Sequence, residues 1–326
     1  MNDVDVLVVG AGVAGLAAAR LLESYSRFVT VVDKGRSVGG RLATRRIDEA
    51  RLDHGAQFFT QRGPEMQSLV EELLDEEVAT EWCRGFGGTD DGHPRYVVPG
   101  GMTGLAKFLA EALEDVRCGV EVRSVTQRDR GWTVEWDGGS VQAGAVLLTS
   151  PVPQSLALMD AGGIQLDPGV RSGLEAVEYD PTIALLVLLD RPSAVPAPGG
   201  VQLTEGPFSW VADNMAKGVS EFPALTLHCD PVTSQALWGA EPQEVLDELL
   251  PAASEWFGEA EVLEAQVKTW RYAIPTTTWP EPYCTAVDGD WPLVLAGDAF
   301  DGPKVEGAYR SGMAAGVRLN RSGVTS

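Results

Sequence analysis

Asp5-Val-Leu-Val-Val-Gly-Ala-Gly-Val-Ala-Gly15 is the stretch that decides the fold of this chain. Its apolar run predicts a buried strand, its glycines open a helix of small residues, and residues 28–33 predict a second strand ending in an aspartate. Gly10 permits the tight turn, Gly12 leaves space for a pyrophosphate, and Gly15 lets the helix pack closely on the strand. A helix N-terminus and a ribose-binding acid complete a dinucleotide-binding βαβ unit. The stretch alone does not say which dinucleotide it binds.

The composition narrows the possible function classes. The chain has 326 residues, of which 44% are hydrophobic, so it can bury a large core and is expected to form two domains. A net charge of −22 argues against binding nucleic acid or anionic membranes. Four distant cysteines without a C-x-x-C pair and three scattered histidines argue against a disulfide reductase and a metal site. Without a long apolar run or a signal-like N-terminus, the chain is expected to be cytoplasmic.

A basic segment follows the second strand, although the chain as a whole is acidic. Residues 34–46 hold five lysine and arginine side chains, with Gly39-Gly40-Arg41 among them. We interpret this segment as a second clamp on a pyrophosphate, with Arg41 as a forked donor. The alternative is a solvated charged loop. An extended FAD needs such a clamp, whereas a domain that binds only NAD does not.

Five further segments complete the expected fold. Residues 52–60 combine small and aromatic side chains that suit contact with a flat ring. The alternative interpretation of this segment is a strand that enters a hydrophobic core. Residues 154–284 hold strand-like runs and a helix near 242–257, which predicts a mixed sheet with a covering helix. Near the C-terminus, a strand ends in Gly297-Asp298 and a helix follows. Its first N–H groups could face the electron-rich edge of a flavin ring. Residues 64–83 predict an amphipathic helix, and residues 84–95 predict a loop or hairpin tip.

Together these motifs resemble the renalase-type flavoproteins, a branch of the FAD-dependent amine oxidase superfamily. The similarity lies in Gly10-x-Gly-x-x-Gly15, Asp33-Lys-Gly-Arg-x-x-Gly-Gly-Arg41, Leu52-Asp-x-Gly-Ala-Gln-Phe-Phe-Thr60, Trp270-Arg-Tyr-Ala and Gly297-Asp-x-x-x-Gly-x-x-x-Glu-Gly-Ala308. The resemblance implies an α/β fold, in which a Rossmann-like FAD-binding domain of glutathione-reductase type carries an inserted mixed-sheet α+β substrate domain. The expected boundaries are 1–60, 96–153 and 285–326 for the FAD-binding domain, and 61–95 and 154–284 for the substrate domain.

The resemblance also implies an activity: oxidation of the 2- and 6-dihydro isomers of NAD(P)H to NAD(P)+, with hydride transfer to the flavin and reduction of dioxygen to hydrogen peroxide. Hydride loss aromatises the ring, so no general base is required. The residues expected to contact the substrate are Gln57, Phe59, Trp210, His228, Trp270 and Tyr272. Those expected to bind FAD are Gly10, Gly12, Ala14, Gly15, Asp33, Lys34, Gly40, Arg41, Gly55, Ala56, Gln57, Val120, Gly297, Asp298, Val305, Glu306 and Ala308.

Two alternatives stay open. The first is a true amine oxidase, in which Trp270 and Tyr272 would form an aromatic pair and Lys268 or Lys304 would hold a water molecule. The second is a flavin-bound protein that binds a ligand without turnover. In each case the flavin is expected to be non-covalent, because residues 297–310 contain no cysteine or histidine. The expected partners are a small-molecule substrate and dioxygen.

Overall fold

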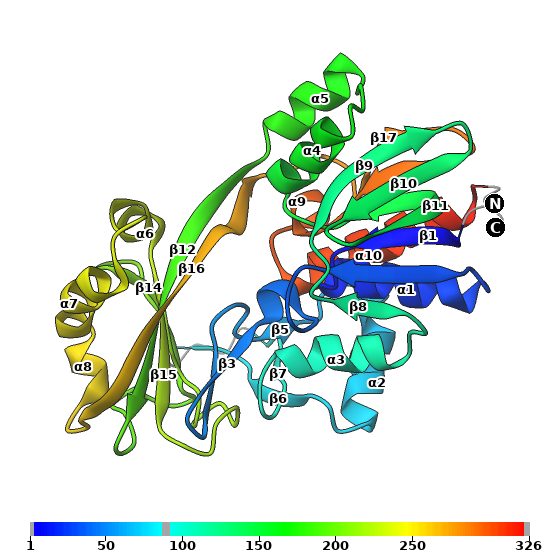
Figure 1. The fold of residues 1–326 in the computed structure, drawn as a ribbon. Helices are drawn as coiled ribbons and strands as arrows, with labels where there is room; N and C mark the ends of the chain where they lie inside the picture. Colours follow the sequence, from blue (N-terminus) through cyan, green and yellow to red (C-terminus); the bar gives the residue numbers. More distant parts are fainter. Residues whose placement is uncertain (1–2, 87–91, 323–326) are drawn as a thin grey trace. The chain divides into compact units, whose positions relative to one another are not determined.

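The structure, a computed structural model, describes residues 3–86 and 92–322 (Figure 1). The chain divides into two compact units, each built from segments that are distant in the sequence. The first unit comprises Met1–Gly40, Ala106–Glu178 and Pro275–Ser326, and the second comprises Arg41–Leu105 and Tyr179–Ile274. The dinucleotide-binding motif lies in the first unit, whose segments alternate along the chain with those of the second.

The first unit is a mixed sheet built around β1 (Val4–Val9), whose six residues are all buried. β1 pairs in parallel with β2 on one side and with β11 on the other. β1 therefore has parallel neighbours on both sides, one from the segment that follows it directly and one from a later segment. In such folds, ligands bind at the carboxyl ends of the strands where the strand order reverses. The remaining strands follow in the order β17-β18-β11-β1-β2-β8, with a β9–β10 extension. Their bounds are β2 (Val29–Asp33), β8 (Val116–Cys118), β9 (Val122–Arg128), β10 (Gly131–Trp136), β11 (Gly139–Leu148), β17 (Cys284–Val287) and β18 (Leu293–Leu295).

Two glycine-containing helices pack together in the first unit. A Cβ on Gly312 of α10 would lie 2.1 Å from the carbonyl oxygen of Ala14 in α1, so the two backbones touch there. Only glycine allows this approach, and it holds the C-terminal helix against the first helix of the chain. The helices assigned to this unit are α1 (Val13–Ser24), α4 (Val152–Ala161), α5 (Pro168–Glu175), α9 (Asp298–Asp301) and α10 (Val305–Asn320), while α3 (Thr103–Glu111) begins in the other unit.

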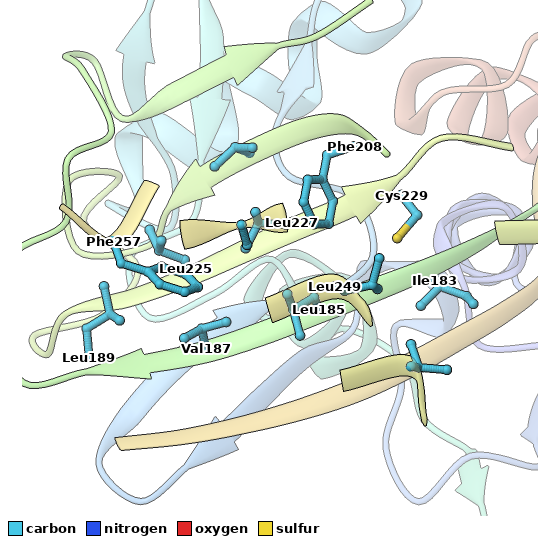
Figure 2. Close-up of a cluster of buried hydrophobic side chains, with 13 residues drawn as sticks. Ile183, Leu185, Val187, Leu189, Phe208, Leu225, Leu227, Cys229, Leu249 and Phe257 are labelled. Atoms are coloured by element: carbon cyan, nitrogen blue, oxygen red, sulfur yellow. The ribbon is translucent and has the colours of Figure 1, made fainter. Parts of the chain in front are cut away.

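The second unit is organised around a five-stranded sheet in the order β13-β14-β15-β12-β16. Its strands are β12 (Glu178–Leu189), β13 (Gly200–Gln202), β14 (Phe208–Asp213), β15 (Ala224–Cys229) and β16 (Val262–Thr277). Alternate residues of β12 and β15 point into one core, which helices α7 (Pro242–Ala252) and α8 (Ser254–Phe257) complete (Figure 2). The strand period of two leaves the intervening residues on the other face. α6 (Pro231–Ala236) follows β15.

A hairpin covers part of that other face. Ile47, Ala50 and Leu52 of the hairpin form a buried cluster with Leu186 and Leu188, together with Ala224. This cluster explains why residues 41–60 belong to the second unit, whereas the sequence analysis expects them in the FAD-binding domain. The hairpin strands are β3 (Thr44–Ile47) and β4 (Ala50–Asp53), preceded by η1 (Gly40–Leu42). The units also differ from the expected domains in that 96–105 lie in the second unit, and 154–178 and 275–284 in the first.

The predicted helix over residues 64–83 is shorter in the structure. The segment contains η2 (Pro64–Met66) and α2 (Gln67–Asp75) and then becomes a strand, β6 (Thr80–Cys83). The helix ends because Glu77 adopts a left-handed backbone with φ +55°, which turns the chain out of the helical path. β6 joins a small sheet with β5 (Phe59–Thr60) and β7 (Arg95–Val97). Of the predicted loop at 84–95, residues 87–91 lie outside the described part.

The confirmed fold class is α/β, with a Rossmann-like domain and mixed sheets. Among the described helices, none is long and apolar enough to cross a bilayer. Within residues 3–86 and 92–322, no group of three or more histidine, cysteine, aspartate or glutamate side chains is placed to hold a metal ion.

Candidate functional site

The glycines of the first turn divide into two kinds by the space around them. A Cβ on Gly10, whose φ is +115°, would lie 2.4 Å from Thr149 Oγ1, and a Cβ on Gly15 would lie 2.0 Å from the Gly10 carbonyl oxygen. Packing within the protein therefore requires glycine at these two positions, whether or not a ligand is bound. At Gly12, by contrast, no atom of the described residues lies within 4 Å of the Cβ position, apart from Gly12 itself and its neighbours in the chain. The space beside Gly12 is open to a ligand that approaches the bare backbone.

Asp33 lies at the end of β2, beside this turn. Its carboxylate accepts hydrogen bonds from the backbone N–H groups of Ala11 (2.7 Å) and Gly35 (2.6 Å). The backbone N–H of Val120 donates to the Asp33 carbonyl oxygen (2.9 Å), which places Val120 next to the same residue. Each carboxylate oxygen can accept more than one hydrogen bond, so Asp33 keeps the capacity to bind a ribose hydroxyl. The two backbone contacts hold the carboxylate in place for that role.

Two helix N-termini belong to this unit. α1 begins at Val13, directly after Gly12, and α10 begins at Val305 with Lys304 as its N-cap. The first N–H groups of a helix have no acceptor within the helix and carry a partial positive charge. The turn before α10 is tight, because a Cβ on Gly307 would lie 2.3 Å from the Gly302 carbonyl oxygen. The open space at Gly12, the oriented carboxylate and the two helix ends fit a dinucleotide with an electron-rich ring.

The C-terminal strand and helix are tied together at Gly297. Its φ is +145°, and its N–H donates to Ser311 Oγ (2.8 Å), which in turn donates to the Pro282 carbonyl oxygen (2.6 Å). Asp298 and Glu306 are mostly buried beside this junction. The junction thus ties the strand end that carries Asp298 to α10, which carries Glu306, in the region where the sequence predicts contacts to the cofactor.

Arg41, Gly55 and Ala56 lie together in the second unit. A Cβ on Gly55 would lie 2.0 Å from the Arg41 carbonyl oxygen, and the Ala56 N–H donates to that oxygen (2.8 Å). The Arg41 guanidinium donates to the carbonyl oxygens of Tyr272 and Ala273, each at 3.2 Å. The structure therefore gives Gly55 a packing reason and Arg41 a backbone partner, and their cofactor contacts remain predictions.

Most of the residues predicted to contact the substrate gather on one face of the second sheet. Trp210 on β14 lies directly opposite His228 on β15, on the face turned away from the hydrophobic core. Trp270 on β16 stacks on the His54 ring, with ring centroids 5.2 Å apart, and donates to the His54 carbonyl oxygen (2.8 Å). Tyr272, two residues further along β16, packs against Tyr179.

The two histidines of this face are uncharged at neutral pH. Burial lowers the pKa of His54 to about 4, with smaller effects from Lys268 and Arg45. Burial likewise lowers the pKa of His228 to about 4, and the positive charge of Lys217 adds to the effect. In addition, His54 Nδ1, His228 Nε2 and the Nε1 of Trp210 are buried without a hydrogen-bond partner among the described residues. A neutral ligand with hydrogen-bonding atoms would satisfy such groups.

Phe59 and Gln57 lie elsewhere than the sequence suggested. Phe59 is fully buried and stacks against Tyr96 (5.4 Å), while its neighbour Phe58 approaches Trp210 (5.7 Å). The strand alternation sends these two adjacent rings to opposite sides. Gln57 uses both ends of its amide inside the protein, because it donates to the Asp53 and Gly55 carbonyl oxygens and accepts from Lys217. Neither residue forms a free wall of the face.

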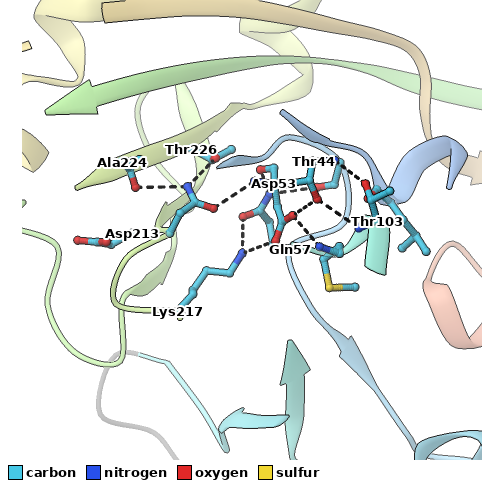
Figure 3. A network of polar contacts seen from close by, with 12 residues as sticks. Thr44, Asp53, Gln57, Thr103, Asp213, Lys217, Ala224 and Thr226 are labelled. Carbon is cyan, nitrogen blue, oxygen red and sulfur yellow. Dashed lines mark hydrogen bonds and ion pairs between the residues drawn. The ribbon is translucent and has the colours of Figure 1, made fainter. Parts of the chain in front are cut away.

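Lys217 and Asp53 are the functional candidates that sequence reasoning missed. Both side chains are completely buried, with Lys217 Nζ 3.4 Å from Asp53 Oδ2 and 3.1 Å from Gln57 Oε1 (Figure 3). The one available signal was that lysine is rare in this chain, which has five. The lysines considered from the sequence lie differently: Lys268 is half-buried on β16, and Lys304 is exposed at the start of α10.

Comparison with known proteins places the chain among flavoproteins. The model of the family "NAD(P)-binding Rossmann-like domain" matches residues 8–73, and that of "Flavin containing amine oxidoreductase" matches residues 74–320. The chain is similar to putrescine oxidase of Kocuria rosea, with 45% identity over 69 residues. That stretch covers 21% of this chain and only 14% of the putrescine oxidase, so the likeness concerns a small part of that relative.

Solved structures share the whole fold at low sequence identity. An engineered triple variant of putrescine oxidase aligns with a TM-score of 0.73 and 17% identity, over 97% of this chain and 98% of that chain. Cyclohexylamine oxidase from Brevibacterium oxydans IH-35A aligns with a TM-score of 0.70 and 16% identity, over 98% and 99%. At such identity the likeness establishes the fold alone.

Proposed function

The chain belongs to the flavin-containing amine oxidoreductases, whose model matches residues 74–320, and from this premise we propose that it is an FAD-dependent oxidase of a hydride donor whose reacting ring is flat and uncharged. Membership makes the chain a flavin-dependent oxidoreductase, as expected from the sequence. The narrower assignment to the renalase branch, and the identity of the donor, belong to the proposal. When bound, FAD would supply the two-electron chemistry by accepting a hydride.

The first unit holds the residues that suit the cofactor. Gly12 and the N-terminus of α1 are proposed to bind the pyrophosphate, and Asp33 the adenosine ribose. The N-terminus of α10 is proposed to stabilise negative charge on the reduced ring. The FAD is proposed to be non-covalent, since residues 297–310 contain neither cysteine nor histidine.

One observation carries the choice of donor: the face around Trp210, His228 and Trp270 is aromatic, its two histidines are uncharged, and it holds buried hydrogen-bonding atoms without a partner among the described residues. The buried Lys217 nearby disfavours a second cation, so an ammonium group is a poor ligand. Histidines with a pKa of about 4 are also weak bases at neutral pH. A dihydronicotinamide fits these conditions, because hydride loss alone converts its ring to an aromatic pyridinium.

The proposed reaction is therefore the oxidation of 2- or 6-dihydro-NAD(P). One dihydronicotinamide, one dioxygen and one proton would give one NAD(P)+ and one hydrogen peroxide. The role of the chain is to orient the ring, satisfy its polar groups and exclude water. The decisive test mixes the FAD-loaded protein, without oxygen, with NADH that contains its isomers. We expect rapid loss of flavin absorbance, and in air we expect one peroxide for each isomer consumed.

A second candidate is an amine oxidase, which the identity to putrescine oxidase over 69 residues favours. In that case an amine, dioxygen and water would give an aldehyde or ketone, ammonia and hydrogen peroxide. Flavin bleaching by putrescine, cyclohexylamine or benzylamine, with no response to the dihydronicotinamide isomers, would replace the first proposal by this one. Flavin that no donor of either class reduces would instead indicate a binding role without turnover.

A further inference from the structure

Lys217 is a buried cation that needs compensation. Its side chain has no exposed surface, and removing an ammonium group from water is costly unless charges and hydrogen bonds replace the solvent. Here the compensation comes from Asp53 Oδ2 at 3.4 Å, Gln57 Oε1 at 3.1 Å and the ring of Trp82, 5.7 Å from Nζ. Burial lowers the pKa of Lys217, and Asp53 opposes that shift.

Both hydrogen-bond acceptors of Lys217 come from one short turn. Asp53 and Gln57 are the first and last residues of the segment 53–57, so the ammonium group joins its two ends. Gln57 Nε2 closes the turn from inside, donating to the carbonyl oxygens of Asp53 (2.6 Å) and Gly55 (3.1 Å). The lysine therefore acts on the shape of this turn through both of its ends (Figure 3).

The turn is anchored on its other side as well. Asp53 Oδ1 accepts from the Thr44 hydroxyl (2.6 Å) and from the Met102 N–H (2.8 Å). The Asp53 N–H donates to Asn214 Oδ1 (3.2 Å), three residues before the lysine in the chain. Asn214 is itself buried and donates to Thr226 Oγ1 (3.0 Å) on β15. The loop 213–217 thus binds the turn at two points, through an amide and through the ammonium group.

The residues held between Asp53 and Gln57 are those with a proposed functional contact. The His54 ring stacks on Trp270, and its carbonyl oxygen accepts from the Trp270 indole. Gly55 and Ala56 lie on the Arg41 backbone and are expected to contact FAD. A buried ion pair is often no more stabilising than apolar residues of equal size, so stability alone is a weak reason for this one.

We propose that Lys217 is a positioning residue, which fixes the turn 53–57 through Asp53 and Gln57 and so places His54, Gly55 and Ala56 for the cofactor and the substrate. The cofactor part rests on the proposed use of FAD. The placement of the turn does not, and it is measurable without any turnover.

The test compares two variants in the full-length protein. Lys217→Met removes the charge at nearly equal volume but leaves Asp53 buried without its cation. The double variant Lys217→Met with Asp53→Asn carries no charge at either position, so it separates loss of positioning from burial of the unpaired Asp53 carboxylate. Lys107→Met, at an exposed position of α3, is the matched control for the loss of one lysine.

The main readout is amide hydrogen exchange of residues 53–57, with the FAD dissociation constant and the visible flavin spectrum as second readouts. We expect exchange in this turn to rise at least about tenfold in both Lys217 variants, with FAD binding weakened about tenfold and the flavin band shifted. Lys217→Arg, which keeps the charge, is expected to recover part of the protection. Lys107→Met is expected to match the wild type in all three measurements.

Unchanged exchange at 53–57 in the soluble, folded double variant would overturn the proposal, because Lys217 would then only fill space. Raised exchange spread over the whole second unit, and not concentrated in the turn, would overturn it as well. If the wild-type protein binds FAD but no donor reduces the flavin, the proposed function fails while the exchange result still decides the role of Lys217.

Discussion

Replacing Gly12 by alanine separates the ligand-binding role of the glycine motif from its role in the fold. The φ of Gly12 is −81° and its ψ is 179°, a backbone that any residue adopts, and the Cβ position is free of neighbouring atoms. The methyl group would point into the space proposed for the FAD pyrophosphate. The variant is therefore expected to fold normally and to lose the cofactor.

The magnitudes follow from the same geometry. Alanine stabilises a compatible backbone by about 0.4–1 kcal/mol, while it is a poorer N-cap than glycine by a similar amount, so the net change in folding free energy is within about 1 kcal/mol. The lost approach of the pyrophosphate is expected to weaken FAD binding at least about 100-fold, which corresponds to about 2.7 kcal/mol.

Gly15→Ala is the matched comparison within one motif. Its Cβ would lie 2.0 Å from the Gly10 carbonyl oxygen, which forces the helix away from the strand. We expect this variant to lose about 1–3 kcal/mol of stability or more. The assays are urea unfolding of the flavin-free proteins and titration with FAD, followed by the quenching of flavin fluorescence. A Gly12→Ala protein that binds FAD as tightly as the wild type would refute the assignment of this space to the pyrophosphate.

Two further predictions concern packing and pH. Gly312→Ala would place a Cβ 2.1 Å from the Ala14 carbonyl oxygen, so α10 must move away from α1. We expect the free energy of unfolding to fall by about 1–3 kcal/mol, which lowers the urea midpoint. An unchanged midpoint would contradict this packing. His54 and His228 have a pKa of about 4 in the folded protein and about 6.5 when unfolded, so the unfolded chain binds more protons between these values. Stability is therefore expected to fall as the pH drops from 6.5 towards 4, by on the order of 1 kcal/mol per histidine once partial exposure is allowed for, and to be unaffected by them above 6.5. In His228→Asn the difference in urea midpoint between pH 7 and pH 5 should shrink, and an equal difference would show that this residue carries no such linkage.

The cofactor-binding half of the protein could be predicted from its sequence because its signals are local. Gly10, Gly12 and Gly15 stand at fixed spacing between a strand and a helix, and each has a separate steric reason that the structure bears out in the free and filled spaces around it. The strand ending at Asp33 follows from an apolar run of the right length. Apart from Thr149, which fills the space beside Gly10, these features depend on neighbours within about thirty residues, so the local sequence largely specifies them.

The face proposed to bind the substrate was predicted only in part. Trp210, His228 and Trp270 do lie on one sheet, yet Phe59 points into another core and Gln57 is engaged inside the protein. In an extended segment, the adjacent rings of Phe58 and Phe59 point to opposite sides. The sequence does not determine which of the two rings faces which side. That choice is made by the pairing of β5 with β7, which the local sequence does not reveal.

By itself, then, the sequence determined the βαβ unit, its glycine geometry and the flavin-type class of the enzyme. Only the tertiary structure decided which lysine is buried, because Lys217 and Asp53 are 164 residues apart and a buried ion pair leaves no periodic pattern in either segment. The environment of a titratable group is a sum over all the elements packed around it. That is why the uncharged histidines and the lysine-held turn 53–57 became visible only once the chain was folded.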